Sequence, residues 1–229
     1  MEKSVILFLI LTALISSGCN NKNNNREKAE QEQENEAVVS AGMILSREEI
    51  QARSFQELFK SIEAKDIPGD VFTLVGSDFT VITAGTASHY NSMVASWGGM
   101  GILFSKPATW CFLRANRYTL EFMRKEQAYT MAYFDDEYKD DIMLFGTKSG
   151  RDSDKMKESK LSSVQTPSGN MAYKEAKLII ECKLTEVTTV SPDDFYLEEG
   201  RNFVMDAHKE ANDYHKIVFG EITNVWVRK

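Results

Sequence analysis

The stretch that most constrains this chain runs from residue 91 to residue 119, where apolar segments alternate with small and cationic residues. Residues 93–97 and 108–114 have the composition of short strands. A glycine-rich break and a Lys-Pro turn separate them, at Gly98, Gly99, Gly101, Lys106 and Pro107. Small residues allow a ligand to approach the backbone closely, so this stretch predicts a binding site on a β framework.

The second strand of this stretch leads into a predicted helix at residues 117–125. Asn116 precedes that helix and can cap it, and the free N–H groups of a helix N-terminus favour an anion. Arg114 and Arg117 lie beside this terminus. One guanidinium group can donate two parallel hydrogen bonds to the oxygens of a phosphate, so the pattern predicts a bound phosphate. A solvated helix start with an arginine lying along the surface is the alternative.

Three segments resemble consecutive motifs of one family. They are Asn91-Ser-Met-Val-Ala-Ser-Trp-Gly98, Arg114-Ala-Asn-Arg-Tyr-Thr119 and Gly146-Thr-Lys-Ser-Gly-Arg-Asp-Ser-Asp-Lys155. In order and spacing they resemble the flavin reductase-like family, the FMN-binding split β-barrels that include flavoredoxin. The resemblance extends from about Phe72 to the end of the chain. Two positions differ from the usual family pattern, with valine at 94 and alanine at 115.

The resemblance implies a mainly β fold, a six-stranded antiparallel barrel of Greek-key type with flanking helices. It also implies FMN as cofactor and a homodimer, since members of the family bind flavin near a two-fold interface. The residues point the same way, because a series of short strands favours a closed or nearly closed antiparallel barrel.

The resemblance also implies which residues bind the cofactor. The first motif would line the ring and ribityl chain, the second would hold the phosphate, and the third would lie near the flavin: Asn91, Ser92, Met93, Ala95, Ser96, Trp97; Arg114, Asn116, Arg117, Thr119; Lys148, Ser149, Gly150 and Lys155. Two alternatives remain open. The first motif also suits a core strand, and residues 148–155 also suit a polar surface loop.

Other reactive side chains are scattered. His215 resembles a histidine that lies near the pocket in members of the family, which makes it a catalytic candidate, and a structural histidine is the alternative. Cys111 and Cys182 lie in apolar strands, where a buried thiol is the usual state, although export leaves a disulfide between them open. The histidines and cysteines show no metal-ligand spacing, so we predict no metal site.

The N-terminus predicts export. Lys3 precedes an apolar run at residues 5–15, which is shorter than the roughly 20 residues of a membrane-spanning helix. Ile15-Ser-Ser-Gly-Cys19 resembles a bacterial lipobox, so we expect residues 1–18 to be a lipoprotein signal and Cys19 the lipid-modified residue. A plain signal peptide cleaved elsewhere is the alternative. The polar residues that follow predict a flexible tether over 19–45, which leaves the chain anchored to a membrane of the cell envelope.

The remainder, 46–229, is expected to form one domain. A capping box and an apolar stripe predict a first helix at 47–63. Further helices are expected at 117–125 and 138–145. Strands are expected at 71–75, 79–84, 93–97, 108–114, 128–134, 176–190 and 217–227, the last with a bulge at Gly220.

The predicted function is an FMN-dependent oxidoreductase that passes hydride or electrons to a second flavin, a metal complex or a protein. The electron donor and acceptor are not predicted. Two alternatives stay open, namely an electron carrier reduced by a partner protein and a flavin-binding protein without redox turnover. A net charge of −7 over 229 residues argues against nucleic acid as a partner.

Overall fold

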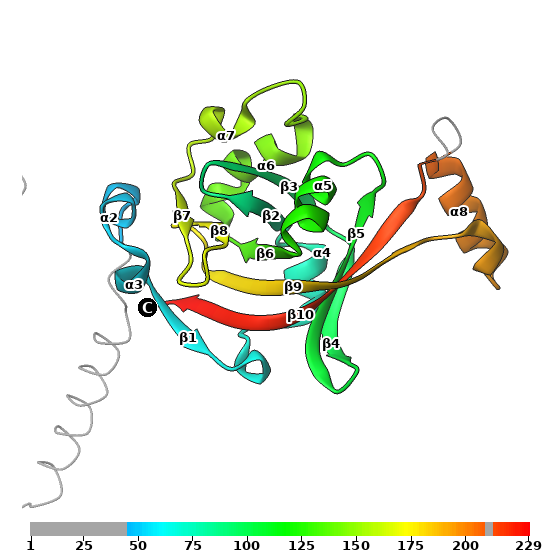
Figure 1. Ribbon diagram of the computed structural model, residues 1–229, viewed down its shortest axis with the longest axis horizontal. Helices are drawn as coiled ribbons and strands as arrows, with labels where there is room; N and C mark the ends of the chain where they lie inside the picture. The colour runs from blue at the N-terminus through cyan, green and yellow to red at the C-terminus, as the bar shows by residue number, and fades with distance from the viewer. Residues whose placement is uncertain (1–44, 209–212) are drawn as a thin grey trace, which may run out of the picture. The chain divides into compact units, whose positions relative to one another are not determined.

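The computed structural model describes residues 45–208 and 213–229, and Ser46–Lys229 forms one unit around a long antiparallel strand pair (Figure 1). The pair consists of β9 (Leu178–Thr189) and β10 (His215–Arg228). Its register shifts twice, between Phe219 and Gly220 and between Ile222 and Asn224. The bulge predicted at Gly220 is therefore confirmed. Residues 1–44 lie outside the described part, and with them the predicted signal, the predicted lipidation site Cys19 and most of the predicted tether.

All the pairings of the main sheet are antiparallel, and its strand order is β3-β2-β6-β9-β10-β5-β4, with β1 on β10. The strands not yet given are β1 (Phe59–Ile62), β2 (Thr80–Thr86), β3 (His89–Ala95), β4 (Gly98–Leu103), β5 (Lys106–Arg114) and β6 (Ala128–Tyr133). The sheet thus has eight strands where six were expected. A separate pair consists of β7 (Ser163–Gln165) and β8 (Met171–Tyr173).

The two edges of the sheet belong to one continuous segment. β3 pairs with β2 at one edge, β4 pairs with β5 at the other, and only Ser96 and Trp97 separate them. The amide of Phe112 donates a hydrogen bond to the carbonyl oxygen of Trp97 at 3.1 Å, which ties this crossing point to β5. The sheet therefore curls into a barrel. The two edge strands, β3 and β4, are joined by the covalent link through Ser96 and Trp97 and not by a ladder of hydrogen bonds between them.

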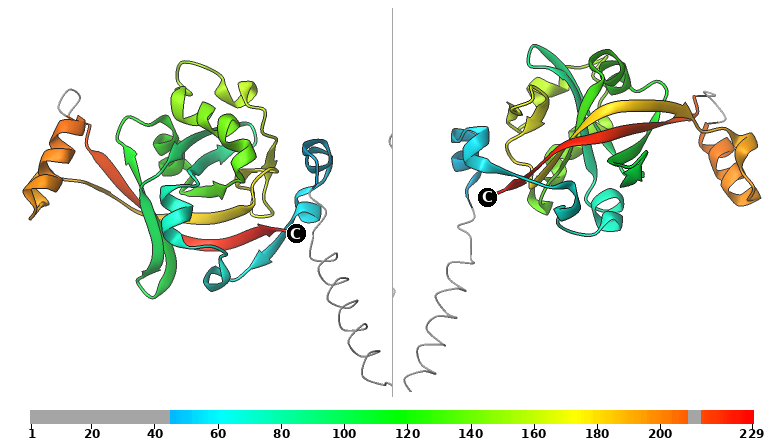
Figure 2. Two further views of the ribbon diagram at one scale, coloured as in Figure 1. Left: turned by 180° about the vertical axis from the view of Figure 1, so that it is seen from behind. Right: turned by 60° about the horizontal axis from the view of Figure 1, so that its bottom comes forward.

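Helices cover the β2–β3 end of the barrel (Figures 1 and 2). α5 (Tyr118–Glu126) packs on β2 and β3, and α6 (Lys139–Thr147) packs on β3. α8 lies at the opposite end of the β9–β10 pair. The other helices are α2 (Arg47–Ala52), α3 (Phe55–Leu58), α4 (Val71–Gly76), α7 (Lys155–Glu158), α8 (Glu198–His208) and the 3₁₀ turns η1 (Ala64–Asp66), η2 (Asp136–Tyr138) and η3 (Pro192–Asp194).

The single helix predicted at 47–63 is wrong. The predicted capping box of Ser46 and Glu49 is present, but the helix that it starts ends at Ala52. Ser54 and Glu57 form a second capping box that begins α3, and the chain then becomes β1, which pairs with β10. The apolar residues of 55–62 recur at helical spacing, but pairing with β10 holds residues 59–62 in a strand. Periodicity alone also does not show that a second N-cap, at Ser54, begins a new helix.

The strand predicted at 71–75 is also wrong, because these residues form α4. The Asp70 carboxylate accepts a hydrogen bond from the amide of Thr73 at 2.9 Å, which caps the helix. Leu74 and Val75 are buried on its inner side. A cap and one buried face outweigh the strand preference of valine, phenylalanine and threonine.

The glycine-rich break after Trp97 is a strand rather than a loop. Gly98, Gly99 and Gly101 lie in β4, and the turn comes later, at Phe104 and Ser105, whose φ angles are +50° and +62°. The predicted Lys-Pro turn is wrong, since Lys106 and Pro107 begin β5. Pro107 is tolerated there because β10 pairs with β5 only as far as Ala108. The segment that forms α8 carried no prediction.

We predict that Gly220→Ala destabilises the fold. A Cβ at this bulge would lie 2.3 Å from the Tyr129 hydroxyl and 2.9 Å from the Cys182 Cβ. Overpacking of this kind costs about 1–3 kcal/mol in the free energy of unfolding, measured by urea denaturation. Gly76→Ala in α4 is the matched control, because a Cβ there meets nothing within 4 Å. Equal stability of the two variants would contradict the bulge packing.

Candidate functional site

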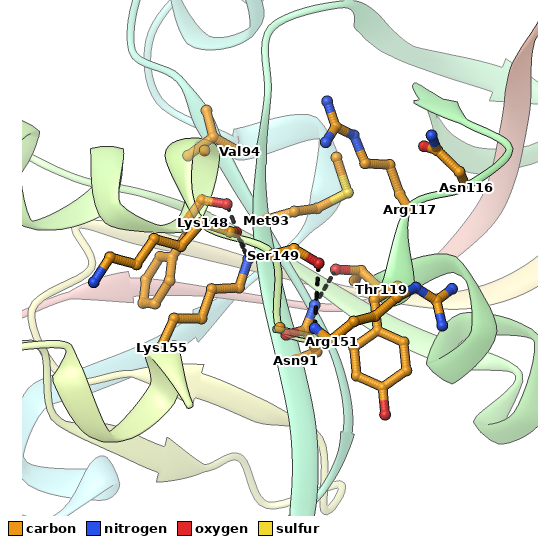
Figure 3. A pocket seen from close by; sticks show the side chains of 14 residues that line it. Asn91, Met93, Val94, Asn116, Arg117, Thr119, Lys148, Ser149, Arg151 and Lys155 are labelled. Carbon is orange, nitrogen blue, oxygen red and sulfur yellow. Dashed lines mark hydrogen bonds between the residues drawn. The ribbon is translucent and has the colours of Figure 1, made fainter. Parts of the chain in front are cut away.

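A cavity of about 320 Å³ opens where β3, the start of α5 and the segment from α6 to α7 meet (Figure 3). In Figure 3, Asn116 and Arg117 lie on one side of the cavity, and Lys148 and Lys155 lie on the other. Its lining consists of Asn91, Met93, Val94, Asn116, Arg117, Tyr118, Thr119, Phe145, Gly146, Lys148, Ser149, Gly150, Arg151 and Lys155. The three sequence motifs, distant along the chain, thus meet in one place.

Asn91 holds the three motifs together. This buried β3 side chain donates from Nδ2 to the Thr119 hydroxyl in α5 at 2.7 Å. On its other side, a Cβ built on Gly150 would lie 2.0 Å from the Asn91 Oδ1 atom. Only glycine allows the loop to approach so closely, which gives Gly150 a steric role.

The start of α5 carries free hydrogen-bond donors. The N-cap is Arg117, whose side chain makes no capping hydrogen bond, so the expectation that Asn116 caps the helix is wrong. The Arg117 amide instead donates to the Arg114 carbonyl oxygen at 3.0 Å. The first amides of an α-helix have no acceptor within the helix. Together with the helix dipole, they make this corner of the cavity favourable for an anion.

Four cations line the cavity, and two of them are paired with carboxylates. The Arg151 guanidinium hydrogen-bonds to Glu121 and lies 4.6 Å from the centroid of the Tyr118 ring. Lys148 is paired with Glu158. Within residues 45–208 and 213–229, neither Arg117 nor Lys155 has a carboxylate partner. The cavity therefore holds positive charge that a bound anion could neutralise.

Lys155 is an unusual buried cation, with only 3% of its surface exposed. Its Nζ atom donates to the carbonyl oxygens of Phe145, at 3.1 Å, and Lys148, at 2.9 Å. Burial, with a smaller contribution from the charge of Arg117, lowers the pKa of Lys155 to about 8. At neutral pH the ammonium group stays charged, and it joins the end of α6 to the loop that follows.

Nine of the predicted binding residues line the cavity: Asn91, Met93, Asn116, Arg117, Thr119, Lys148, Ser149, Gly150 and Lys155. Two more lie on the same strand but point elsewhere. Ser92 is buried and hydrogen-bonds to the Thr83 and Tyr173 hydroxyls at 2.8 and 2.7 Å, and Ala95 is part of the core. Side chains alternate along a strand, so Ser92 faces away from the side that Asn91 and Met93 present to the cavity. Alternation does not explain the rest of the motif, since Val94 lines the cavity and Ala95 does not.

The other three predicted residues lie outside the cavity. Ser96 and Trp97 line a separate apolar groove beside α4. Arg114 donates to the Ala207 carbonyl oxygen at 2.8 Å, and its guanidinium lies 3.8 Å from the Asp213 carboxylate. Arg114 therefore joins the end of β5 to the end of α8, and Arg117 is the arginine of this motif that faces the cavity.

Five lining residues were not among those predicted: Val94, Tyr118, Phe145, Gly146 and Arg151. Four of them, Val94, Tyr118, Gly146 and Arg151, lie inside the quoted motifs, so the signal was present. Val94, one of the two positions that differ from the usual family pattern, contributes apolar surface beside Gly146, where its Cβ lies 3.5 Å from a Cβ built on that glycine. Phe145 precedes the third motif and carried no signal beyond helix periodicity.

His215 does not line the cavity; it belongs to a hydrogen-bonded chain at the end of α8. Asp213 Oδ1 lies 3.2 Å from His208 Nδ1, and His208 Nε2 lies 2.8 Å from His215 Nδ1. The His215 ring also lies against Trp97, with 5.0 Å between centroids. Burial first, then the positive charges of His208 and Arg114, lower the pKa of His215 to about 4.

The two described cysteines, Cys111 and Cys182, are buried and form no disulfide bond. Burial raises the pKa of both thiols, that of Cys182 to about 12, so they stay protonated and unreactive at neutral pH. In residues 45–208 and 213–229, no group of three or more His, Cys, Asp or Glu side chains is placed to hold a metal ion.

Comparison with known proteins identifies a family to which most of the chain is similar. A family model described as a flavin reductase like domain matches residues 73–229. No curated protein sequence matches the chain.

Several solved structures share the fold. An FMN-binding protein from Thermus thermophilus with bound 1-cyclohex-2-enone has a TM-score of 0.52 and 18% identity, covering 73% of this chain and 80% of its own. Flavoredoxin from Methanosarcina acetivorans has a TM-score of 0.50 and 16% identity, covering 73% and 75%. An FMN-binding domain of a flavin reductases-like enzyme from Shewanella baltica has a TM-score of 0.52 and 15% identity, covering 74% and 76%. The predicted mainly β split-barrel fold is confirmed.

We predict that His215 makes the fold sensitive to mild acid. Its pKa of about 4 lies below the ordinary value of 6.5, so the unfolded chain binds this proton more readily than the folded chain. The free energy of unfolding should then fall as pH decreases from 6.5 to 4. Urea denaturation at both pH values should show a smaller fall for His215→Gln than for wild type. His89→Gln, at an exposed position, should keep the wild-type fall; the same fall in all three proteins would contradict this role.

Proposed function

Since the chain belongs to the flavin reductase like domain family, we propose that it is a flavin-dependent redox protein whose cofactor is FMN. The observation that carries this proposal is the cavity in which Arg117, without a carboxylate partner among the described residues, lies at the open N-terminus of α5. An anionic group at one end of a partly apolar ligand suits this arrangement. FMN has that form, a phosphate joined through a ribityl chain to a flat ring.

The residues present fit such a ligand. Arg117 and the first amides of α5 would hold the phosphate, with Asn116 and Ser149 as further polar partners. Met93 and Val94 from β3 supply apolar surface for a flat ring. A cavity of about 320 Å³ lies at the lower end of the range of roughly 300–1,000 Å³ that is usual for small-molecule sites.

When bound, FMN supplies the electron-transfer chemistry itself. The chain then has to bind the cofactor, fix its orientation and set the charge around it. Lys155 places a positive charge at the cavity wall, and its two carbonyl partners hold that charge in place. A fixed cation favours a ligand state that carries more negative charge.

We propose first that the protein is an enzyme that takes hydride or electrons from a donor and passes them to a second flavin, a metal complex or a protein. The predicted export favours a second candidate, an electron carrier reduced by a partner protein, because nicotinamide cofactors are scarce outside the cytoplasm. Simple flavin binding without turnover is the third.

We further propose that the protein is anchored to a membrane of the bacterial cell envelope through lipid on Cys19 and acts as a homodimer. The apolar run and the lipobox-like segment support the anchor. The described helices include none with the length and apolar character of a membrane span. Family membership supports the homodimer.

We predict that Arg117→Ala weakens FMN binding. Removing a hydrogen-bonded charge from the phosphate should cost about 1.5–3 kcal/mol, or roughly 10- to 150-fold in the dissociation constant measured by flavin fluorescence. Arg124→Ala, in the last turn of the same helix, is the matched control and should bind as wild type does. If the two variants bind FMN equally well, Arg117 is not a phosphate ligand.

Turnover should separate the first two candidates. With FMN bound, we expect the protein to oxidise NADH or NADPH at least tenfold faster than the same concentration of free FMN does. Initial rates of absorbance loss at 340 nm measure this, with Arg117→Ala as the variant that should lose the excess. A protein that binds FMN but gives no excess rate would exclude the nicotinamide-dependent reductase and leave the carrier.

A further inference from the structure

The segment that leads into α8 exposes three consecutive large apolar side chains. The exposed fractions are 36% for Phe195, 102% for Tyr196 and 76% for Leu197. The helix behind them has a single buried residue, His208. We call residues 195–197 the tip. Soluble proteins seldom expose such a run without a partner for it, so this segment has the character of a contact surface.

A groove on the same chain has the complementary character. It lies between α4 and β4, has a volume of about 510 Å³, and is lined by Val71, Phe72, Val75, Trp97, Met100 and Trp110 together with small residues. Among the residues that the structure describes, no charged residue lines it. Phe72 and Trp97 are 85% and 45% exposed at its rim. The groove therefore suits an apolar side chain that projects from another molecule.

We infer that the tip of a second copy of this chain lies in the groove between α4 and β4, and that the first copy's tip lies in the second copy's groove. This inference deepens the proposed homodimer and rests on it. Figures 1 and 2 both show α8 projecting from the end of the β9–β10 pair, with α4 against the body of the barrel. Under two-fold symmetry each contact occurs twice, so both grooves and both tips of the dimer are occupied. The assembly is then closed, and it does not extend into a filament.

The exposed aromatic surface of the tip and the groove reaches the minimum area of a specific interface. Four aromatic side chains, Phe72, Trp97, Phe195 and Tyr196, are from one third to fully exposed. With 150–250 Å² for each fully exposed ring, they offer on the order of 500 Å² in each copy. Covering this in both copies gives about 1,000 Å², near the lower limit for a specific protein interface.

The charges around the tip favour a protein groove over a membrane surface. Asp193 and Asp194 precede the tip, and Glu198 and Glu199 follow it directly. Four carboxylates so close to the apolar side chains would be repelled by anionic lipid headgroups. A groove without charged lining residues imposes no such repulsion, while the carboxylates stay in solvent at its rim.

Crosslinking between two differently tagged full-length chains tests the inference. One chain carries Leu197→Cys and the other Phe72→Cys, both at exposed positions where substitution should not disturb folding. Treatment of cells that express both chains with a short bis-maleimide should give a band that carries both tags. Ile102→Cys replaces Phe72→Cys in the matched control, since Ile102 is 73% exposed on β4 but does not line the groove. We expect at least tenfold less crosslinked product with the control.

A second measurement does not depend on crosslinking geometry. Co-purification of the two tagged chains should fall at least tenfold with Leu197→Glu in both copies and stay unchanged with Ile102→Glu. Equal product from the Phe72 and Ile102 pairs, or undiminished co-purification with Leu197→Glu, would overturn the inference. Flavin absorbance of the same preparations is read separately. A colourless dimer would refute the FMN proposal alone, and a yellow monomer would refute the interface alone.

Discussion

The architecture depends on one crossing, where the chain passes from β3 at one edge of the sheet to β4 at the other. Gly98 makes this possible, because a Cβ there would lie 2.2 Å from the Trp110 carbonyl oxygen. The backbone of β4 therefore lies closer to β5 than any side chain would permit. Without that approach the barrel would stay open, and β3 would not present Asn91 and Met93 to α5 and the 146–155 loop.

The cavity is then held by polar contacts rather than by apolar packing alone. Asn91 joins β3 to α5, and Lys155 joins the end of α6 to the loop through two carbonyl oxygens. Burying an ammonium group is costly unless it is well hydrogen-bonded, so the loop has few alternatives to this conformation. A site held in this way is ordered before a ligand arrives, which reduces the entropy lost on binding.

The sequence indicated which segments meet at the cavity better than it indicated several elements of the fold. The resemblance of three motifs to one family singled out segments that do meet at the cavity, where the Gly150 backbone lies close to the Asn91 side chain. Residues 71–75 were misassigned because composition favours a strand while the Asp70 cap fixes a helix. Strand alternation turned Ser92 away from the cavity, and contact with Ala207 and Asp213 turned Arg114 away. Such outcomes depend on contacts distant in sequence, which periodicity does not report.

The segment from β3 to β4 serves two surfaces in succession. Met93 and Val94 line the cavity, and Trp97, after a few more residues, lines the groove. Trp97 also touches Phe203 of α8, with 5.8 Å between ring centroids, and His215 of β10. A partner seated in the groove would restrict Trp97 and, through the continuous backbone, the end of β3. The cavity and the groove therefore share one continuous segment of backbone, in which only two residues, Ala95 and Ser96, separate Val94 from Trp97.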